Sequence, residues 1–212
     1  MRNDPAGAAL APRSALAAIA AAFLLAGCAL VGGEKEPVAI YAPVPRVAAN
    51  PDWPVAQWQL GITRPHANGM LESRRIAVRP VPGELQVYKG ALWATEPAEQ
   101  LRDVVLRSLE DSDKIAAVAR QESGIASDYR LEMDLRRYEA EYGGAAVPAA
   151  LIEVHAKLVR SIGREVVAER TFRESIPAQG TDPAQVSQAF GMALGEIGHA
   201  ITAWTLESGK PL

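Results

Sequence analysis

The sequence predicts an α+β domain in two layers, a mixed and mostly antiparallel sheet with two helices packed on one face. The first observation is a series of segments in which apolar and polar residues alternate, the period of a half-buried strand. The second is a pair of longer segments, opening near residues 95 and 182, whose apolar residues recur every three or four positions. The third is a run of three strand segments joined by short turns, which indicates an antiparallel meander.

A secretion and lipidation signal precedes this domain. Arg2 and Arg13 lead into twelve apolar residues at 15–26, the pattern of a cleavable signal peptide. The run falls short of the ~20 residues that a membrane-spanning helix needs, so we do not expect a span. It ends in a bacterial lipobox, in which the thiol of the last residue takes a diacylglycerol group. The predicted lipobox residues are Leu25, Ala26, Gly27 and Cys28.

Cleavage would remove residues 1–27 and leave Cys28, the only cysteine in the sequence, as the lipidated first residue. The 22 basic and 25 acidic residues would become 20 and 24 with the loss of Arg2, Asp4 and Arg13, a formal charge of −4. This charge balance lacks the excess of basic residues that is typical of proteins that bind nucleic acid. An acylated cysteine cannot form a disulfide, so packing alone must stabilise the domain in an oxidising compartment.

The mature chain is expected to divide into three parts. Residues 28–54 hold prolines at five positions and are predicted to be an extended tether. Two aromatic residues of this segment, Tyr41 and Trp53, can either pack on the domain or sit in the membrane interface. Residues 55–206 are the predicted α+β domain, and residues 207–212 are a C-terminal tail.

Several short strands are predicted around the first helix. The segments concerned are residues 58–62, 75–81, 85–93 and 115–118. Prolines end the second of them because proline gives no N–H to the ladder. Thr95 is the predicted N-cap of the helix, with Pro97 tolerated in its first turn.

The longest strand pattern of the chain lies at residues 128–142. Its apolar residues occupy odd positions up to Leu135 but even positions from Tyr138 onward. A period-two pattern changes parity only when a residue is inserted, so we predict a β-bulge at Arg136 and Arg137.

The meander is followed by the second, longer helix. Residues 150–159 and 166–172 are its second and third strands, joined by a turn that contains Gly163. Asp182 is the predicted N-cap of the last helix, with Pro183 at its first position. Three glycines lower the propensity of this helix by about 1 kcal/mol each, which indicates close approach of another segment, and we expect that segment to be the sheet. The glycines are Gly191, Gly195 and Gly198.

Several of these segments, in their order behind a lipobox, resemble the ABC-type transport auxiliary lipoproteins. The run Leu92–Leu101 is similar to the tryptophan, acidic residue and proline that open the first helix of that family. Residues 128–140 and 164–172, and the alanine-rich helix that reaches Trp204, are similar to its long strand, its hairpin and its last helix. The resemblance covers residues 55–206. The first strand departs from it, because the corresponding strand of the family is led by a tyrosine.

The family includes the lipoprotein partners of MCE-type intermembrane lipid transport systems, the PqiC-like group. The resemblance implies a non-catalytic accessory lipoprotein held by lipid on Cys28 at the periplasmic face of the outer membrane. Ala29 agrees with this location, because an aspartate there would signal retention in the inner membrane. The implied partners are an MCE-domain protein and the permease and ATPase of the transporter. The resemblance implies no cofactor beyond the lipid. Assembly into a homo-oligomer stays an open alternative.

The residues themselves form no catalytic or metal-binding pattern. His66, His155 and His199 have no carboxylate or cysteine at ligand spacing, and the sequence has no Gly-rich phosphate loop. We therefore expect neither catalysis nor a metal. Two other classes stay open: a lipoprotein that supports assembly of an outer-membrane β-barrel, and a small periplasmic enzyme.

Two segments are candidates for docking a partner protein, with a merely solvated surface as the alternative for each. One is the predicted bulge at Arg136 and Arg137. The other is the loop that follows residues 75–81. Its candidate residues are Pro80, Pro82 and Gly83.

Overall fold

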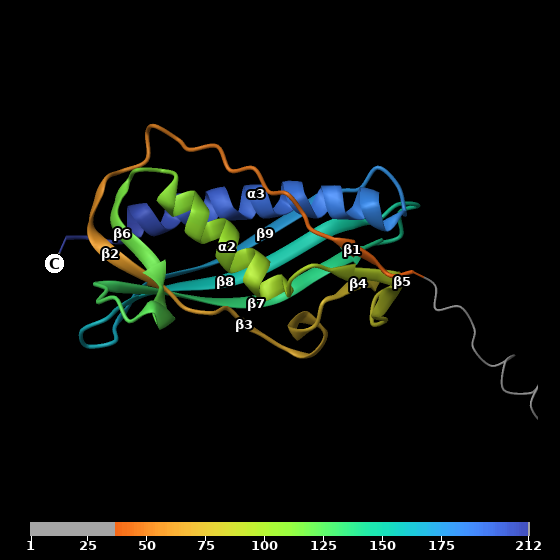
Figure 1. Ribbon diagram of the computed structural model, residues 1–212, viewed down its shortest axis with the longest axis horizontal. Helices are drawn as coiled ribbons and strands as arrows, with labels where there is room; N and C mark the ends of the chain where they lie inside the picture. Colours follow the sequence, from red (N-terminus) through yellow and green to blue (C-terminus); the bar gives the residue numbers. More distant parts are fainter. Residues whose placement is uncertain (1–36, 212) are drawn as a thin grey trace, which may run out of the picture. The chain divides into compact units, whose positions relative to one another are not determined.

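The computed structural model describes residues 37–211, which contain a mixed sheet and two helices (Figure 1). The strands are β1 (Ala39–Tyr41), β2 (Ala56–Ile62), β3 (His66–Ala67), β4 (Arg75–Arg79), β5 (Gln86–Trp93), β6 (Ile115–Arg120), β7 (Tyr129–Glu141), β8 (Ala149–Arg160) and β9 (Val166–Pro177). The helices are α2 (Pro97–Glu110) and α3 (Pro183–Ser208), with short 3-10 helices η1 (Gly69–Glu72) and η2 (Gln121–Ser123). The chain from Val38 onward forms one compact unit.

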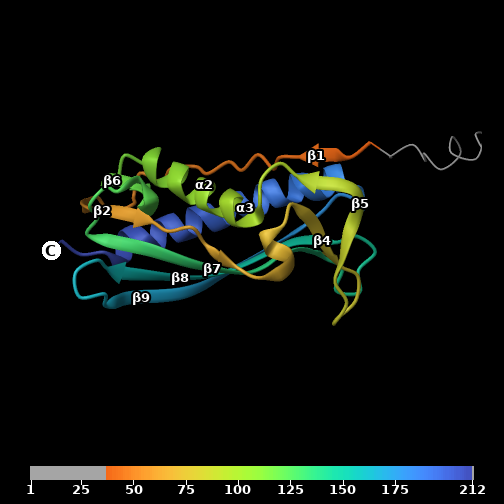
Figure 2. The same cartoon turned by 60° about the horizontal axis from the view of Figure 1, so that its bottom comes forward.

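Both helices lie on one face of the sheet (Figure 1, Figure 2). α3 packs along β8 and β9, and α2 packs beside α3. An aromatic cluster joins the two layers: Phe190 of α3 stacks on Tyr138 of β7 with ring centroids 4.5 Å apart. Trp93 of β5 meets these two rings edge-on, at 5.1 and 5.9 Å. The predicted two-layer α+β fold is therefore confirmed.

β7 is the central strand of the sheet. One of its edges pairs antiparallel with β8 along nearly the whole of both strands, and β8 pairs antiparallel with β9. Its other edge pairs in parallel with three shorter strands in turn, β2, β3 and β4. β6 extends the sheet beyond β2, while β5 and β1 extend it beyond β4. The antiparallel pairings are fewer than the parallel ones, but two of them, β7–β8 and β8–β9, contain most of the paired residues, in agreement with the mostly antiparallel sheet predicted from the sequence.

The predicted β-bulge is present in β7. Leu135 lies opposite Val154 and Arg137 lies opposite Glu153, so Arg136 has no residue opposite it. Because of the inserted residue, the apolar side chains before the bulge and those after it both face the helices. Tyr138 is 1% exposed as a result, like the apolar residues before the bulge.

The two helices begin in different ways. Asp182 caps α3 by accepting a hydrogen bond from a backbone N–H of the first turn at 2.8 Å, as predicted. The prediction for α2 is wrong, because its N-cap is Glu96 rather than Thr95. Pro97 explains the difference, since its fixed φ makes it the first helical residue and places the cap directly before it. The carboxylate of Glu96 makes no capping bond and pairs with Arg64 at 2.5 Å.

Much of the segment predicted to be a tether is folded onto the domain. β1 pairs in parallel with β5, and the backbone N–H of Ala94 donates to the carbonyl of Tyr41 at 2.8 Å. Trp53 is 5% exposed and lies against the ring of His199, so this aromatic residue packs on the domain. The compact unit therefore begins at Val38, earlier than the predicted domain boundary at residue 55.

The C-terminal residues after α3 contact two strands of the sheet, β2 and β7. The hydroxyl of Tyr129 donates to the carbonyl of Lys210 at 2.9 Å. A Cβ at Gly209 would lie 2.2 Å from the indole ring of Trp58, so the backbone here is in direct contact with that ring. The start of the predicted tail is thus held against β2 and β7.

Candidate functional site

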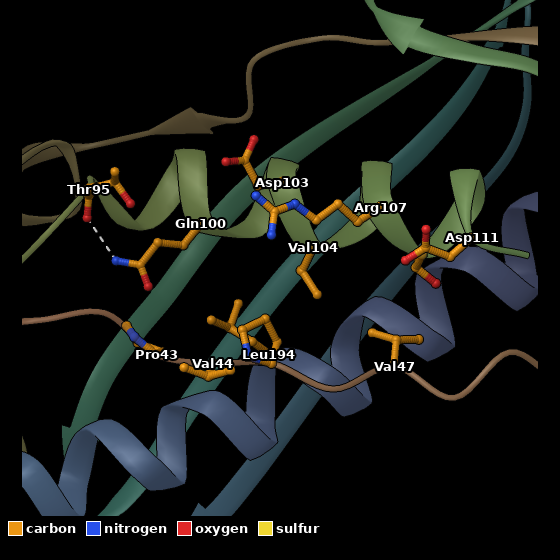
Figure 3. Close-up of a pocket in the computed structure, with 12 residues that line it drawn as sticks. Pro43, Val44, Val47, Thr95, Gln100, Asp103, Val104, Arg107, Asp111 and Leu194 are labelled. Atoms are coloured by element: carbon orange, nitrogen blue, oxygen red, sulfur yellow. Dashed lines mark hydrogen bonds between the residues drawn. The ribbon is translucent and has the colours of Figure 1, made fainter.

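An extended segment at residues 42–50, here called the strap, lies on the helices on the side away from the sheet (Figure 2, Figure 3). A Cβ at Gly195 of α3 would lie 2.6 Å from the carbonyl oxygen of Arg46. One at Gly191 would lie 3.2 Å from the carbonyl oxygen of Val44. The close approach predicted at these glycines is confirmed, but the expected partner is wrong: the strap, and not the sheet, occupies the space.

The third glycine lies where the strap, α2 and α3 meet. A Cβ at Gly198 would lie 3.0 Å from a methyl carbon of Val104 in α2 and 3.3 Å from one of Val47 in the strap. Close by in the helix pair, the buried hydroxyl of Thr202 donates to that of Ser108 at 2.8 Å. The helix pair and the strap therefore form one packed layer.

Polar contacts hold the C-terminal end of the strap. The Nδ1 atom of His199 lies 3.2 Å from the carbonyl oxygen of Ala48, and it must carry a proton because a carbonyl only accepts. Just beyond the strap, Lys114 donates from Nζ to the carbonyl of Pro51 at 2.8 Å. The strap is thus fixed at this end by hydrogen bonds and along its middle by packing on glycine.

A groove of about 410 Å³ separates the strap from α2, and we call it the α2 groove (Figure 3). Its wall formed by α2 and the residues flanking that helix carries the polar residues Thr95, Gln100, Asp103, Arg107 and Asp111, while its strap side is apolar. Gln100 is fixed in place, because its amide donates to the carbonyl of Thr95 at 2.8 Å and accepts from the hydroxyl of Tyr138 at 2.7 Å. This groove therefore presents a polar wall opposite an apolar one.

A second groove, of about 520 Å³, lies between the strap and the first half of α3, and we call it the α3 groove. Val44 lines both grooves and is 76% exposed, and Met192 on α3 is 51% exposed. Glu196 lies at its edge. Burial, together with the charge of Glu196, raises the pKa of nearby Glu174 on β9. The α3 groove is therefore partly apolar, with Arg46 and Glu196 supplying charges of both signs along its lining.

The predicted docking residues at the bulge lie away from the strap, on the other face of the sheet. Arg137 forms ion pairs with Glu139 and, at 2.6 Å, with Glu141. Arg79 of β4 binds the same Glu139 through two hydrogen bonds, of 2.8 and 3.0 Å. Arg137 is therefore engaged within the fold, whereas the side chain of Arg136 is 43% exposed beside Asp134.

Glu139 is the centre of this charged cluster and is 3% exposed. Burial alone would raise the pKa of its carboxyl, but the hydrogen bonds and charges of Arg79 and Arg137 outweigh burial and lower the pKa below its usual value of 4.5. The carboxylate is therefore held in its charged form and ties β4 to β7.

The other predicted docking residues lie in the turn between β4 and β5. Gly83 adopts a φ of 85°, which the turn requires and other residues rarely take. Pro82 is exposed and Pro80 is half-buried. Arg79 connects the start of this turn to Glu139, so the structure brings the two predicted candidates to one region. It does not place either of them on the strap surface, by which we mean the strap at residues 42–50 together with the α2 and α3 grooves beside it.

The lipobox residues Leu25, Ala26, Gly27 and Cys28 lie outside the described residues. Within residues 37–211, no group of three or more His, Cys, Asp or Glu side chains could hold a metal ion. Neither described helix has the length and apolarity of a membrane span. The strap surface was not predicted, although the spacing of the three glycines in α3 was the signal that marked it.

The fold and the strap surface together define a helix-on-sheet domain whose outer layer offers grooves to another molecule. A family model described as the ABC-type transport auxiliary lipoprotein component matches residues 40–202, from β1 into α3. The chain belongs to this family, as its resemblance predicted.

Two solved structures and one curated relative are similar to this chain. Protein XCC0632 from Xanthomonas campestris is 49% identical, with a TM-score of 0.78 over 81% of this chain and 97% of its own. Protein bll6063 of Bradyrhizobium diazoefficiens is 29% identical over 147 residues, which span 69% of this chain but 39% of that relative. Protein CT253 from Chlamydia trachomatis shares the fold at 7% identity, with a TM-score of 0.52.

Proposed function

We propose that the protein is a periplasmic lipoprotein, anchored to the outer membrane through lipid on Cys28, and a non-catalytic accessory component of an MCE-type intermembrane lipid transport system. The family match over residues 40–202 carries this proposal. The lipobox at residues 25–28 supports the anchor, and Ala29 directly after it supports the outer membrane.

The length of the connection to the anchor keeps the domain close to the membrane. The compact unit begins at Val38, so the ten residues 28–37 connect it to the lipid. Extended chain spans at most about 3.6 Å per residue, so this connection reaches at most about 36 Å. That is no longer than α3, whose 26 residues measure about 39 Å at 1.5 Å per residue. The partner must therefore reach the domain near the membrane surface.

The strap surface is the proposed docking site for the MCE-domain protein. Val44 stands between the two grooves, and Met192 extends the apolar surface along α3. Exposed apolar residues that line a groove beside polar ones are the kind of residues that can carry most of the binding energy of an interface. Arg46 and Glu196 place charges of both signs along the α3 groove, which favours a partner segment that combines apolar side chains with complementary charged ones.

Affinity isolation of the tagged, full-length lipoprotein with its transport partners tests this function. The wild type is expected to recover the MCE protein together with the permease and ATPase. The double variant Val44→Glu/Met192→Glu should recover roughly tenfold less of the MCE protein, because it places charge in the centre of the interface. Ile162→Glu is the matched control, because Ile162 is an equally apolar and more exposed residue, 81% exposed, in the turn between β8 and β9.

Two results would contradict the proposal in different ways. Recovery of an outer-membrane β-barrel protein without any MCE subunit would overturn the transport role. Unchanged recovery of the MCE protein by the double variant would leave the role intact and remove the strap surface as the docking site. A Cys28→Ala variant should fold but lose its membrane location and its function.

A further inference from the structure

We propose that one end of the domain, formed by β1 and the β4–β5 hairpin, rests on the phospholipid surface that holds the lipid of Cys28. We call this region the tether end. Figure 1 and Figure 2 both place β1, β4 and β5 at one end of the domain and the β8–β9 turn at the other. The inference rests on the proposed lipid anchor and adds a second, non-covalent contact with the membrane.

The first argument is the place where the short connection joins the domain. Only the nine residues 29–37 lie between Cys28 and Val38, the first residue of the compact unit. β1 follows at once, and the strap then runs from Val44, beside Gly191, to Ala48, beside His199, along α3. The connection to the anchor is therefore attached near the end of the domain at which α3 begins, and not near the end at which α3 ends.

The second argument is an asymmetry among the five tyrosines of the chain. Tyr129 and Tyr138 are buried, at 1% exposed each. Tyr41, Tyr88 and Tyr142 are only partly buried, on β1, on β5 and directly after β7. Tyr88 interacts with Tyr142, so these two rings lie together; the Tyr88 hydroxyl is buried, and burial raises its pKa, which leaves Tyr41 and Tyr142 as the tyrosines nearer the surface at this end. Tyrosine combines an apolar ring with a polar hydroxyl, the combination favoured at the boundary between lipid and water.

The third argument is the mixture of apolar and basic residues around these tyrosines. Val38 and Ile40 of β1 are 53% and 63% exposed. In the hairpin between β4 and β5, Val81 and Leu85 are 51% and 40% exposed. Such side chains can enter the upper layer of a bilayer without unfolding any part of the domain.

Basic residues accompany this apolar surface. Val38 lines a groove of about 350 Å³ together with Arg75, Lys89 and apolar residues of β5, and the neighbouring Arg74 is also exposed. Glu84 is the acidic residue of the hairpin, and it accepts a hydrogen bond from Gln86. Basic side chains beside exposed apolar ones are the features that bind an anionic phospholipid surface.

Depth-dependent fluorescence quenching in vesicles tests this orientation. The full-length lipidated protein is reconstituted into vesicles of phosphatidylethanolamine and phosphatidylglycerol. Single variants Ile40→Cys, Leu85→Cys and, as the control, Ile162→Cys are labelled with an environment-sensitive dye. Cys28 is the only natural cysteine and its thiol is blocked by lipid, so each variant takes one dye. A nitroxide lipid in the bilayer should quench the dyes at positions 40 and 85 several-fold more than the dye at position 162.

The outcomes separate this inference from the proposed function. A wild-type protein that fails to float with the vesicles, or whose Cys28 takes the dye, would overturn both. A protein that floats but shows equal quenching at all three positions, or stronger quenching at position 162, would overturn the tether-end contact alone. All three labelled positions are exposed, so far-ultraviolet circular dichroism should be unchanged in each variant.

Discussion

β7 and the strap are both extended chain, but the fold holds them in different ways. β7 is bonded along both edges, to β8 on one side and to β2, β3 and β4 on the other. The strap at residues 42–50 lies on two helices, fitted against glycines and fixed near its end by His199. Damage to β7 should therefore unfold the domain, whereas damage to the strap should release a segment and leave the sheet intact.

The largest effect is expected from deleting Arg136. The deletion would remove the inserted residue and turn Tyr138 and Ala140, both buried, away from the helices. We expect a loss of more than about 4 kcal/mol in the free energy of unfolding, measured by urea denaturation, because every core residue after the bulge changes face. The control Arg136→Ala keeps the residue count and should change stability by at most about 0.5 kcal/mol. A deletion variant as stable as the control would show that the bulge is dispensable.

Glu139→Ala is expected to have the next largest effect. It would leave Arg79 and Arg137 without their shared, buried carboxylate. We expect a cost of about 3 kcal/mol, at the lower end for a broken buried pair because both arginines are partly exposed. Glu153→Ala is the matched control, since its pair with Arg173 lies at 3.4 Å on the exposed face and should contribute less than about 1 kcal/mol. Equal losses in the two variants would contradict a central role for Glu139.

The same cluster should make stability depend on pH. The pKa of Glu139 is lowered in the folded state from its usual value of 4.5, so its stabilising contribution is present above about pH 4.5. The contribution is lost as the pH falls through the lower, folded pKa, where the carboxylate takes up a proton. Unfolding measured against pH should therefore converge for the wild type and Glu139→Gln below that range. A stability difference that stays constant down to pH 2 would refute this assignment.

A smaller and more local effect is expected at the strap. Gly195→Ala would place a Cβ 2.6 Å from the carbonyl oxygen of Arg46, where backbone must move. The crowding should cost about 1–3 kcal/mol, partly offset by the ~1 kcal/mol that alanine adds to helix propensity. Hydrogen exchange should speed up at residues 42–50 and stay unchanged in β7.

Gly191→Ala is the matched control for the strap. Its Cβ would lie 3.2 Å from the carbonyl oxygen of Val44, a distance that a shift of a few tenths of an ångström relieves. The gain in helix propensity then offsets the crowding, and the net change should be within about 0.5 kcal/mol. A larger loss at Gly191 than at Gly195 would mean that the strap does not follow the described path.

The smallest effect is expected from removing the cap of α3, the helix that supports the strap. Asp182→Ala loses the hydrogen bond to the first turn, which should cost about 1 kcal/mol in thermal or urea unfolding. Asp182→Asn keeps an accepting oxygen and should lose less. If both variants lose the same amount, the hydrogen bond is not the source of the stability.

The contrast between β7 and the strap also explains what the sequence could predict. The bulge was predictable because a change of parity within thirteen residues is local information, and no other part of the chain is needed to detect it. The ion pairing of Arg137 was not predictable. It depends on Arg79, which binds the same Glu139 and lies 60 positions away from it in the sequence. The glycines of α3 indicated a close neighbour correctly, but nothing in their spacing distinguishes a sheet from a strap.

The N-cap of α2 shows a second limit of the sequence argument. Thr95 and Glu96 are adjacent, and residue preference favours threonine as the cap. The position of Pro97 decided the outcome, because it fixes the first helical residue. The proline-rich segment at residues 28–54 shows the same limit. Its composition predicts an extended chain, but it does not predict whether that chain packs on the domain. The strap is extended as predicted, yet it is part of the folded domain.

The most direct test of the account is site-specific photo-crosslinking in cells that make the complete transport system. A photoreactive amino acid at Val44 in the strap should yield an adduct with the MCE protein, and one at Ile162 should yield none. The same adduct should be lost when Cys28→Ala removes the anchor, because the domain then no longer lies at the membrane where the partner reaches it. Strong MCE adducts at Ile162 with none at Val44 would contradict the strap surface as the docking site, and adducts to a β-barrel protein alone would contradict the transport function.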